Sequence, residues 1–174
     1  MERKPLGMEA IFNPRSVAVI GASDNPGKLG SHVMRSLIEG RYPGKIFPIN
    51  PGKDEILGIK AYPSLLQVSE ELDLSVIALP AEQIPKTIKE CGEKGIHGII
   101  LITAGFKEIE DKRGEALQQE ITDLANQLNI KILGPNTFGV VNLHLPMNAS
   151  FTPEFSWVDK GGISLVSQSG GCLT

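Results

Sequence analysis

The sequence has few cysteines, few aromatic residues, no long apolar run and no large net charge. Its two cysteines, Cys91 and Cys172, form no CxxC pair, so the sequence predicts neither a disulfide framework nor a metal site and suits a reducing, cytoplasmic setting. No apolar stretch approaches the roughly 18 residues of a membrane helix, so no membrane span is expected. The net charge of −3 excludes a broad positive field for nucleic acid. An anionic ligand would have to be bound by local groups.

Short apolar runs rich in β-branched residues alternate with segments of helical periodicity. Such runs suit strands that are buried on both faces of a parallel sheet. The predicted strands are 17–20, 45–50, 74–79, 98–102 and 131–133. The predicted helices, with apolar residues one, three and four apart, are 31–39, 84–94 and 114–128. This alternation predicts an α/β fold, a Rossmann-like doubly wound parallel sheet with helices on both faces.

The pattern changes near the end of the chain. Residues 142–160 contain Pro146, Pro153 and several aromatic side chains, and they predict an irregular packed linker. A new strand is predicted at 161–166, followed by a glycine-rich turn at 167–171. We therefore expect a Rossmann-like domain over 1–141, a linker over 142–160, and the truncated start of a second, flavodoxin-like domain over 161–174.

Four predicted strand ends carry glycine, proline and small polar residues. They are 21–26, 50–53, 79–81 and 103–105. Ligands of open parallel sheets bind outside the carboxyl ends of the strands. The first loop leads into a helix amino end, where free N–H groups and the helix dipole attract phosphate, and Lys28 and Lys53 would add positive charge. One such loop is equally typical of an ordinary turn, but four together favour a ligand site.

The dinucleotide fingerprint GxGxxG is interrupted in this sequence. Ser23 occupies the position of the second glycine. The second predicted strand ends in Asn50, with Lys53 close behind, where an acidic residue would bind a ribose hydroxyl of NAD. These residues argue against NAD. NADP and coenzyme A both carry a ribose phosphate that a lysine attracts, so residue types leave both open.

Five segments, in order, resemble the ADP-forming acetyl-CoA synthetases. They are FNPRSVAVIGAS at 12–23, VIALPA at 76–81, ITAGFKE at 102–108, LGPN at 133–136 and VSQSGG at 166–171. The first four resemble the coenzyme A-binding domain of these nucleoside-diphosphate-forming enzymes, and the fifth resembles the start of their second domain. The α subunit of succinyl-CoA synthetase is a more distant relative of the same design.

The resemblance implies that coenzyme A lies across the strand ends. Residues 23–26 would hold its nucleotide end, and 50–53 would lie near the adenosine and its phosphates. Residues 79–81 and 102–104 would line the pantetheine arm, and Asn136 would lie near the thiol. The candidate binding residues are Gly21, Ser23, Asp24, Asn25, Pro26, Lys28, Asn50, Pro51, Lys53, Leu79, Pro80, Ala81, Ile102, Thr103, Ala104 and Asn136. Thr137 departs from the family, in which cysteine is common at this position.

The resemblance also implies a reaction for the parent protein. A carboxylate, coenzyme A and ATP would be interconverted with acyl-CoA, ADP and phosphate through a phosphohistidine. That histidine and the binding sites for ATP, ADP and Mg would lie in downstream domains or in a β subunit. This chain is therefore expected to bind coenzyme A or acyl-CoA without catalysis. His32, His97 and His144 are interpreted as structural or surface residues, and Cys91 as a core residue. The alternatives are a coenzyme A-binding regulatory region of a protein acetyltransferase and an NAD(P)-binding Rossmann domain.

Overall fold

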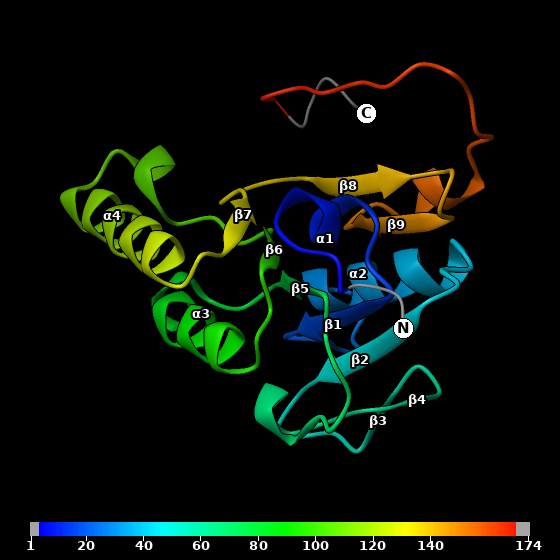
Figure 1. The fold of residues 1–174 in the computed structure, drawn as a ribbon, viewed down its shortest axis with the longest axis horizontal. Helices are drawn as coiled ribbons and strands as arrows, with labels where there is room; N and C mark the ends of the chain where they lie inside the picture. The colour runs from blue at the N-terminus through cyan, green and yellow to red at the C-terminus, as the bar shows by residue number, and fades with distance from the viewer. Residues whose placement is uncertain (1–3, 170–174) are drawn as a thin grey trace.

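The computed structural model describes residues 4–169, and a five-stranded parallel sheet forms its centre (Figure 1). The strands are β1 (Ser16–Ile20), β2 (Lys45–Ile49), β5 (Leu74–Ile77), β6 (Gly98–Leu101) and β7 (Lys131–Leu133). They lie in the order β2-β1-β5-β6-β7, and every neighbouring pair is parallel. The predicted α/β doubly wound sheet is therefore confirmed.

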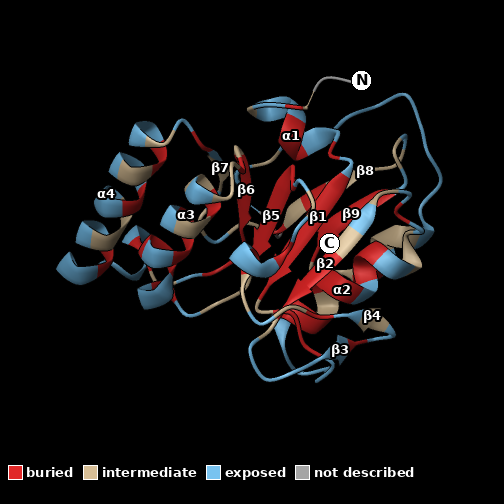
Figure 2. Cartoon of the chain, turned by 60° about the horizontal axis from the view of Figure 1, so that its bottom comes forward, coloured by how far each residue is buried: buried red, intermediate tan, exposed pale blue. Residues whose placement is uncertain are grey.

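The central strands are apolar throughout because both of their faces are covered. All residues of β1 are buried, and successive side chains enter different cores. Val17 and Val19 belong to the core on one face, whereas Ala18 and Ile20 belong to the core on the other. Figure 2 shows the central strands as the most buried part of the molecule. Pro48 fits in β2 because β2 is the edge strand of the sheet.

Helices cover both faces of the sheet. One face carries α1 (Met8–Phe12), α2 (Leu29–Glu39) and the hairpin of β8 (Gly139–Asn142) and β9 (Met147–Ser150). The other carries α3 (Ile84–Glu93), α4 (Lys112–Gln127) and the short helix η1 (Leu65–Gln67). Helix α4 begins two residues before the predicted Gly114, because the Asp111 carboxylate accepts a hydrogen bond from the N–H of Arg113 at 3.3 Å and caps its amino end.

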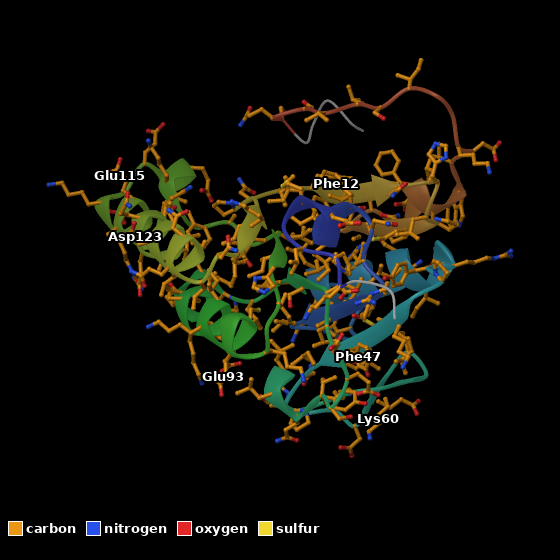
Figure 3. The ribbon with its side chains drawn as sticks, in the orientation of Figure 1. Phe12, Phe47, Lys60, Glu93, Glu115 and Asp123 are labelled. Carbon is orange, nitrogen blue, oxygen red and sulfur yellow. The ribbon has the colours of Figure 1, made fainter. Side chains whose placement is uncertain are left out.

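The short elements lie around the sheet, in its connections. They are the hairpin of β3 (Glu55–Ile56) and β4 (Ile59–Lys60), and the 3-10 helices η2 (Ala81–Gln83), η3 (Lys107–Ile109) and η4 (Pro153–Trp157). In the stick view, Lys60 marks the β3–β4 hairpin, whereas Glu115 and Asp123 lie on α4 at the far side of the molecule (Figure 3). Among residues 4–169, no helix is both long and apolar enough to span a membrane.

The segment at 142–160, expected to be an irregular packed linker, is packed but is not irregular throughout. It contains β9 and η4, and both pack against α2. The buried Asn148 side chain organises this segment, since its Nδ2 donates to the carbonyl of Thr152 and to Ser156 Oγ, both at 2.9 Å. Ser156 Oγ in turn donates to the carbonyl of Ser36 in α2 at 3.0 Å. Hydrophobic periodicity gives no sign of these bonds, because they join polar groups, and the bond to Ser36 spans 120 residues.

The strand expected at 161–166 does not form among the described residues. Residues 161–166 have no ladder partner, and Ile163 and Val166 are 96% and 94% exposed. A strand needs a neighbouring edge for its backbone hydrogen bonds, and none of the described segments offers one here. Gly170 and Gly171 of the predicted turn, and Cys172, lie outside the described residues.

Candidate functional site

A cleft of about 1020 Å³ opens at the carboxyl ends of the central strands. In the sheet, β2 lies on one side of β1, and β5, the next strand of the sheet along the chain, lies on the other side of β1. The strand order therefore reverses between β1 and β5. Doubly wound sheets bind their ligands at this point. The lining residues are Ile20, Gly21, Ala22, Ser23, Lys28, Leu29, Gly30, Ile49, Asn50, Pro51, Pro63, Ser64, Leu65, Ala78, Leu79, Pro80, Glu82, Gln83, Lys86, Thr87, Glu90, Thr103 and Ala104.

Two glycines bring the amino end of α2 against the end of β1. Gly21 has a φ of +88°, and a Cβ there would lie 2.5 Å from the carbonyl oxygen of Ala78. A Cβ on Gly30 would lie 1.9 Å from the carbonyl oxygen of Gly21. No described side chain caps the amino end of α2 at Lys28, so the N–H groups of Leu29 and Gly30, both in the cleft lining, have no side-chain acceptor. An anion is the natural partner for such groups.

Asn50 joins the loops that follow β1 and β2. Its Nδ2 donates to the carbonyl of Ala22, and its Oδ1 accepts from the N–H of Gly52, both at 2.8 Å. Ser23 Oγ similarly accepts from the N–H of Asn25 at 3.1 Å within the first loop. Asn50 was predicted as a ligand contact. The structure uses its side chain to hold the two loops that form one wall of the cleft.

Asp24 and Lys53 form an ion pair between the same two loops. Lys53 Nζ lies 3.0 Å from Asp24 Oδ2, and the two side chains are 48% and 46% exposed. The hydrogen bond from Lys53, with the positive charges of Lys53 and Lys28, holds the pKa of Asp24 below its usual value. Neither residue of the pair lines the cleft, but Ser23, next to Asp24, and Pro51, two residues before Lys53, do. The pair therefore lies at the rim.

The opposite wall, formed by η2 and α3, carries charges that are already compensated. Glu82 lies 3.3 Å from Arg113, and Glu90 lies 3.7 Å from Lys86 on the next helical turn. Pairing reduces the repulsion that these carboxylates would exert on an anionic ligand. Two lysines are among the described residues that line the cleft. Lys86 is paired with Glu90, and Lys28, beside the α2 amino end, is outside these ion pairs. The anionic part of a ligand is therefore favoured on the α2 side.

The loops after β5 and β6 are joined by Thr103. Its Oγ1 donates to the carbonyl of Leu79 at 2.7 Å, and its carbonyl accepts from the N–H of Asn136 at 2.9 Å. Leu79, Pro80, Thr103 and Ala104 line the cleft as one continuous wall. The Asn136 side chain is exposed outside the cleft lining.

The structure brings most of the predicted binding residues together. Those that line the cleft are Gly21, Ser23, Lys28, Asn50, Pro51, Leu79, Pro80, Thr103 and Ala104. Those outside the lining are Asp24, Asn25, Pro26, Lys53, Ala81, Ile102 and Asn136. Two of these residues are outside the lining because they are buried in the cores. Ile102 belongs to the core beneath α2, and Ala81 belongs to the core beneath α3.

Sequence reasoning missed the part of the cleft formed by η1 and α3. Pro63 and Ser64 line it from one side, and Gln83, Thr87 and Glu90 from the other. These residues carry no motif. A helical periodicity does mark Thr87 as adjoining the apolar stripe of α3, but only the crossing of η1 and α3 makes this surface concave.

The described cysteine and the three histidines lie outside the cleft lining. Cys91 is fully buried in α3, as predicted, and burial raises the pKa of its thiol to about 12. The ring of His97 contacts the carbonyl of Asn129 at 3.2 Å, and that of His144 contacts the carbonyl of Gly161 at 3.2 Å. His32 lies on α2. Over residues 4–169, no three His, Cys, Asp or Glu side chains are grouped to hold a metal.

The sheet order and the cleft at its switch point define a Rossmann-like domain, with a cleft where such domains hold their ligands. Residues 15–142 match the CoA binding domain family, and the chain belongs to that family.

Named relatives agree with this assignment. The chain is 45% identical over 166 residues to the ADP-forming acetate–CoA ligase of Methanocaldococcus jannaschii, covering 95% of this chain and 23% of the relative. It is 44% identical to the subunit alpha of ADP-forming acetate–CoA ligase I of Pyrococcus furiosus, covering 95% of this chain and 36% of the relative. The chain thus spans about a quarter to a third of these relatives.

A solved structure shows the same architecture. It is the dinucleotide-forming acetyl-coenzyme A synthetase 1 of Ca. Korarchaeum cryptofilum in complex with phosphate and ADP. The TM-score is 0.89 at 38% identity, over 95% of this chain and 34% of that one.

Proposed function

We propose that this chain is the coenzyme A-binding part of an ADP-forming acyl-CoA synthetase. The observation that carries the proposal is the cleft at the β1–β5 switch point, with the α2 amino end in its wall, in a chain of the CoA binding domain family. The relatives that match it bear ligase names, which favours this function over a regulatory region of an acetyltransferase. A cytoplasmic location belongs to the same proposal.

The charges in the cleft suggest an orientation for the ligand. The phosphates of coenzyme A would lie at the α2 amino end, near Lys28 and within reach of Lys53 at the rim. The uncharged pantetheine arm would pass along the wall of Leu79, Pro80 and Ala104, where apolar groups predominate. Asn50 would act by holding the phosphate-side loops together.

The parent reaction would convert a carboxylate, coenzyme A and ATP to acyl-CoA, ADP and phosphate. In this proposal the phosphohistidine, ATP, ADP and Mg belong to parts beyond these residues, in downstream domains or a β subunit. The relative named as a subunit alpha supports a divided enzyme. The described residues contribute binding and orientation of coenzyme A, and we expect the isolated chain to form no thioester above a matched blank.

Calorimetry tests the ligand directly. Coenzyme A, dephospho-coenzyme A, NAD and NADP are titrated into samples of one preparation. We expect coenzyme A to bind at least about tenfold more tightly than NAD or NADP, the difference that one or two charge-assisted hydrogen bonds supply. Higher salt should weaken binding, because it screens exposed lysines. Equal or better affinity for either nicotinamide cofactor would mean that the ligand is wrongly assigned.

A further inference from the structure

Among the described residues, the Asp24–Lys53 pair is the ion pair that links the loop after β1 to the loop after β2. Three other residues of these two loops, Ser23, Lys28 and Asn50, line the cleft. The lysine that is best placed to reach a ligand phosphate at this rim is thus already engaged by a carboxylate of the same chain.

The geometry of the pair indicates that it is exchangeable. Both side chains are almost half exposed, and exposed ion pairs contribute little net stability. The loops have a second link besides this ion pair, since Asn50, after β2, donates from Nδ2 to the carbonyl of Ala22, after β1. A phosphate carries more charge than a carboxylate and more acceptor atoms, so it can replace Asp24 at Lys53 without opening the wall.

We propose that Asp24 is a competitor for the ligand's ribose phosphate: it holds Lys53 in the free protein and releases it when that phosphate binds. The ribose phosphate is the relevant one because Lys53 follows β2, and residues at the end of this strand meet the ribose in doubly wound folds. The inference rests on the proposed coenzyme A function. It assigns Asp24 a role in lowering affinity and in discriminating between phosphorylated and unphosphorylated ribose.

The variant Asp24→Asn tests the competition. It keeps the size of the side chain and removes the charge that Lys53 pairs with. At low salt we expect coenzyme A to bind about two- to fivefold more tightly, the range that an exposed ion pair supports, with dephospho-coenzyme A unchanged. In 0.5 M salt the gain should largely disappear. Asp54→Asn is the matched control. Asp54 is exposed in the same loop as Lys53, and its carboxylate forms no ion pair within residues 4–169, so its gain should be smaller.

A double-mutant cycle with Lys53→Ala isolates the exchange. Lys53→Ala should weaken coenzyme A binding about fivefold, and Asp24→Asn should then give no further gain, because the cation for which the two anions compete is gone. Carbon NMR of the Asp24 carboxyl gives a second measurement. The pKa of Asp24 should rise when coenzyme A saturates the protein, because the carboxylate then loses its hydrogen bond from Lys53. Of the two lysines that lower this pKa, only Lys28 would still act on it.

The outcomes are separable. If the unchanged protein does not bind coenzyme A, the proposed function and this inference both fail. If the unchanged protein binds coenzyme A but Asp24→Asn binds it equally or more weakly, only the inference fails, because Asp24 then orients Lys53. An equal gain for dephospho-coenzyme A would overturn the assignment to the ribose phosphate.

Discussion

Replacement of Gly30 by alanine is expected to destabilise the domain by about 3 kcal/mol or more and to abolish measurable coenzyme A binding. The added Cβ would lie 1.9 Å from the carbonyl oxygen of Gly21, a backbone atom that cannot rotate away. Helix propensity favours alanine over glycine by about 1 kcal/mol, which is smaller than this steric cost. The α2 amino end must therefore move away from β1, and its N–H groups leave the cleft. Denaturant unfolding and calorimetry measure the two effects.

Gly27→Ala is the matched control for this prediction. Gly27 lies in the loop that leads into α2, and the nearest contact of a Cβ there would be the Asn25 side chain at 3.4 Å, an ordinary van der Waals distance. We expect its stability and its affinity for coenzyme A to change little. If Gly30→Ala behaved like Gly27→Ala, the close approach of α2 to β1 would not be what shapes the anion site.

Replacement of Arg15 by methionine is expected to lower the free energy of unfolding by about 3 kcal/mol, because it leaves a buried carboxylate without its cation. Asp73 is 1% exposed, and the Arg15 guanidinium donates to both of its oxygens at 3.1 Å. The backbone N–H of residue 15 also donates to Asp73, at 2.9 Å, and this hydrogen bond remains after the substitution. For this reason, we expect the lower end of the 3–5 kcal/mol range for breaking buried pairs. Denaturant unfolding gives the value.

Arg35→Met provides the comparison for Arg15→Met. Arg35 and Arg15 are similarly exposed, at 46% and 41%, but Arg35 pairs with Glu39 along the surface of α2. Such a pair contributes about 0.5 kcal/mol or less. Because Arg15 and Asp73 precede β1 and β5, they lie at the end of the sheet opposite the cleft. The folded Arg15→Met protein should thus bind coenzyme A normally, and equal losses of stability in the two variants would contradict the assigned role.

The predicted strands agree with the structure to within about two residues, because their signal is local. Val17 to Ile20 are apolar on both faces, and only a strand covered on both sides buries such a run. The largest errors fell after residue 141. There, Asn148, Thr152 and Ser156 fold through polar hydrogen bonds, and the expected strand at 161–166 has no partner among the described residues.

The same distinction applies to the candidate site. Gly21, Ser23 and Lys28 could be predicted because the turn after a first buried strand has a recognisable composition. The lining residues Gln83 of η2 and Glu90 of α3 could not be predicted, because they become part of a site only through the packing of these elements beside the strand ends. Lys53 was predicted as a ligand group, but its pairing with Asp24 joins residues 29 positions apart and depends on how two loops pack.

The amino-acid sequence by itself determined the alternation of strands and helices, the glycine turn at the end of β1 and the resemblance to ADP-forming acyl-CoA synthetases. Periodicity, propensity and motif are properties of neighbouring residues, and a reader of the sequence has all of them. Only the tertiary structure decided which strand ends share the cleft, which cations in it are already paired, and that residues 147–157 pack against α2. These features depend on distances between residues remote in sequence, and such distances are set by packing of the whole domain.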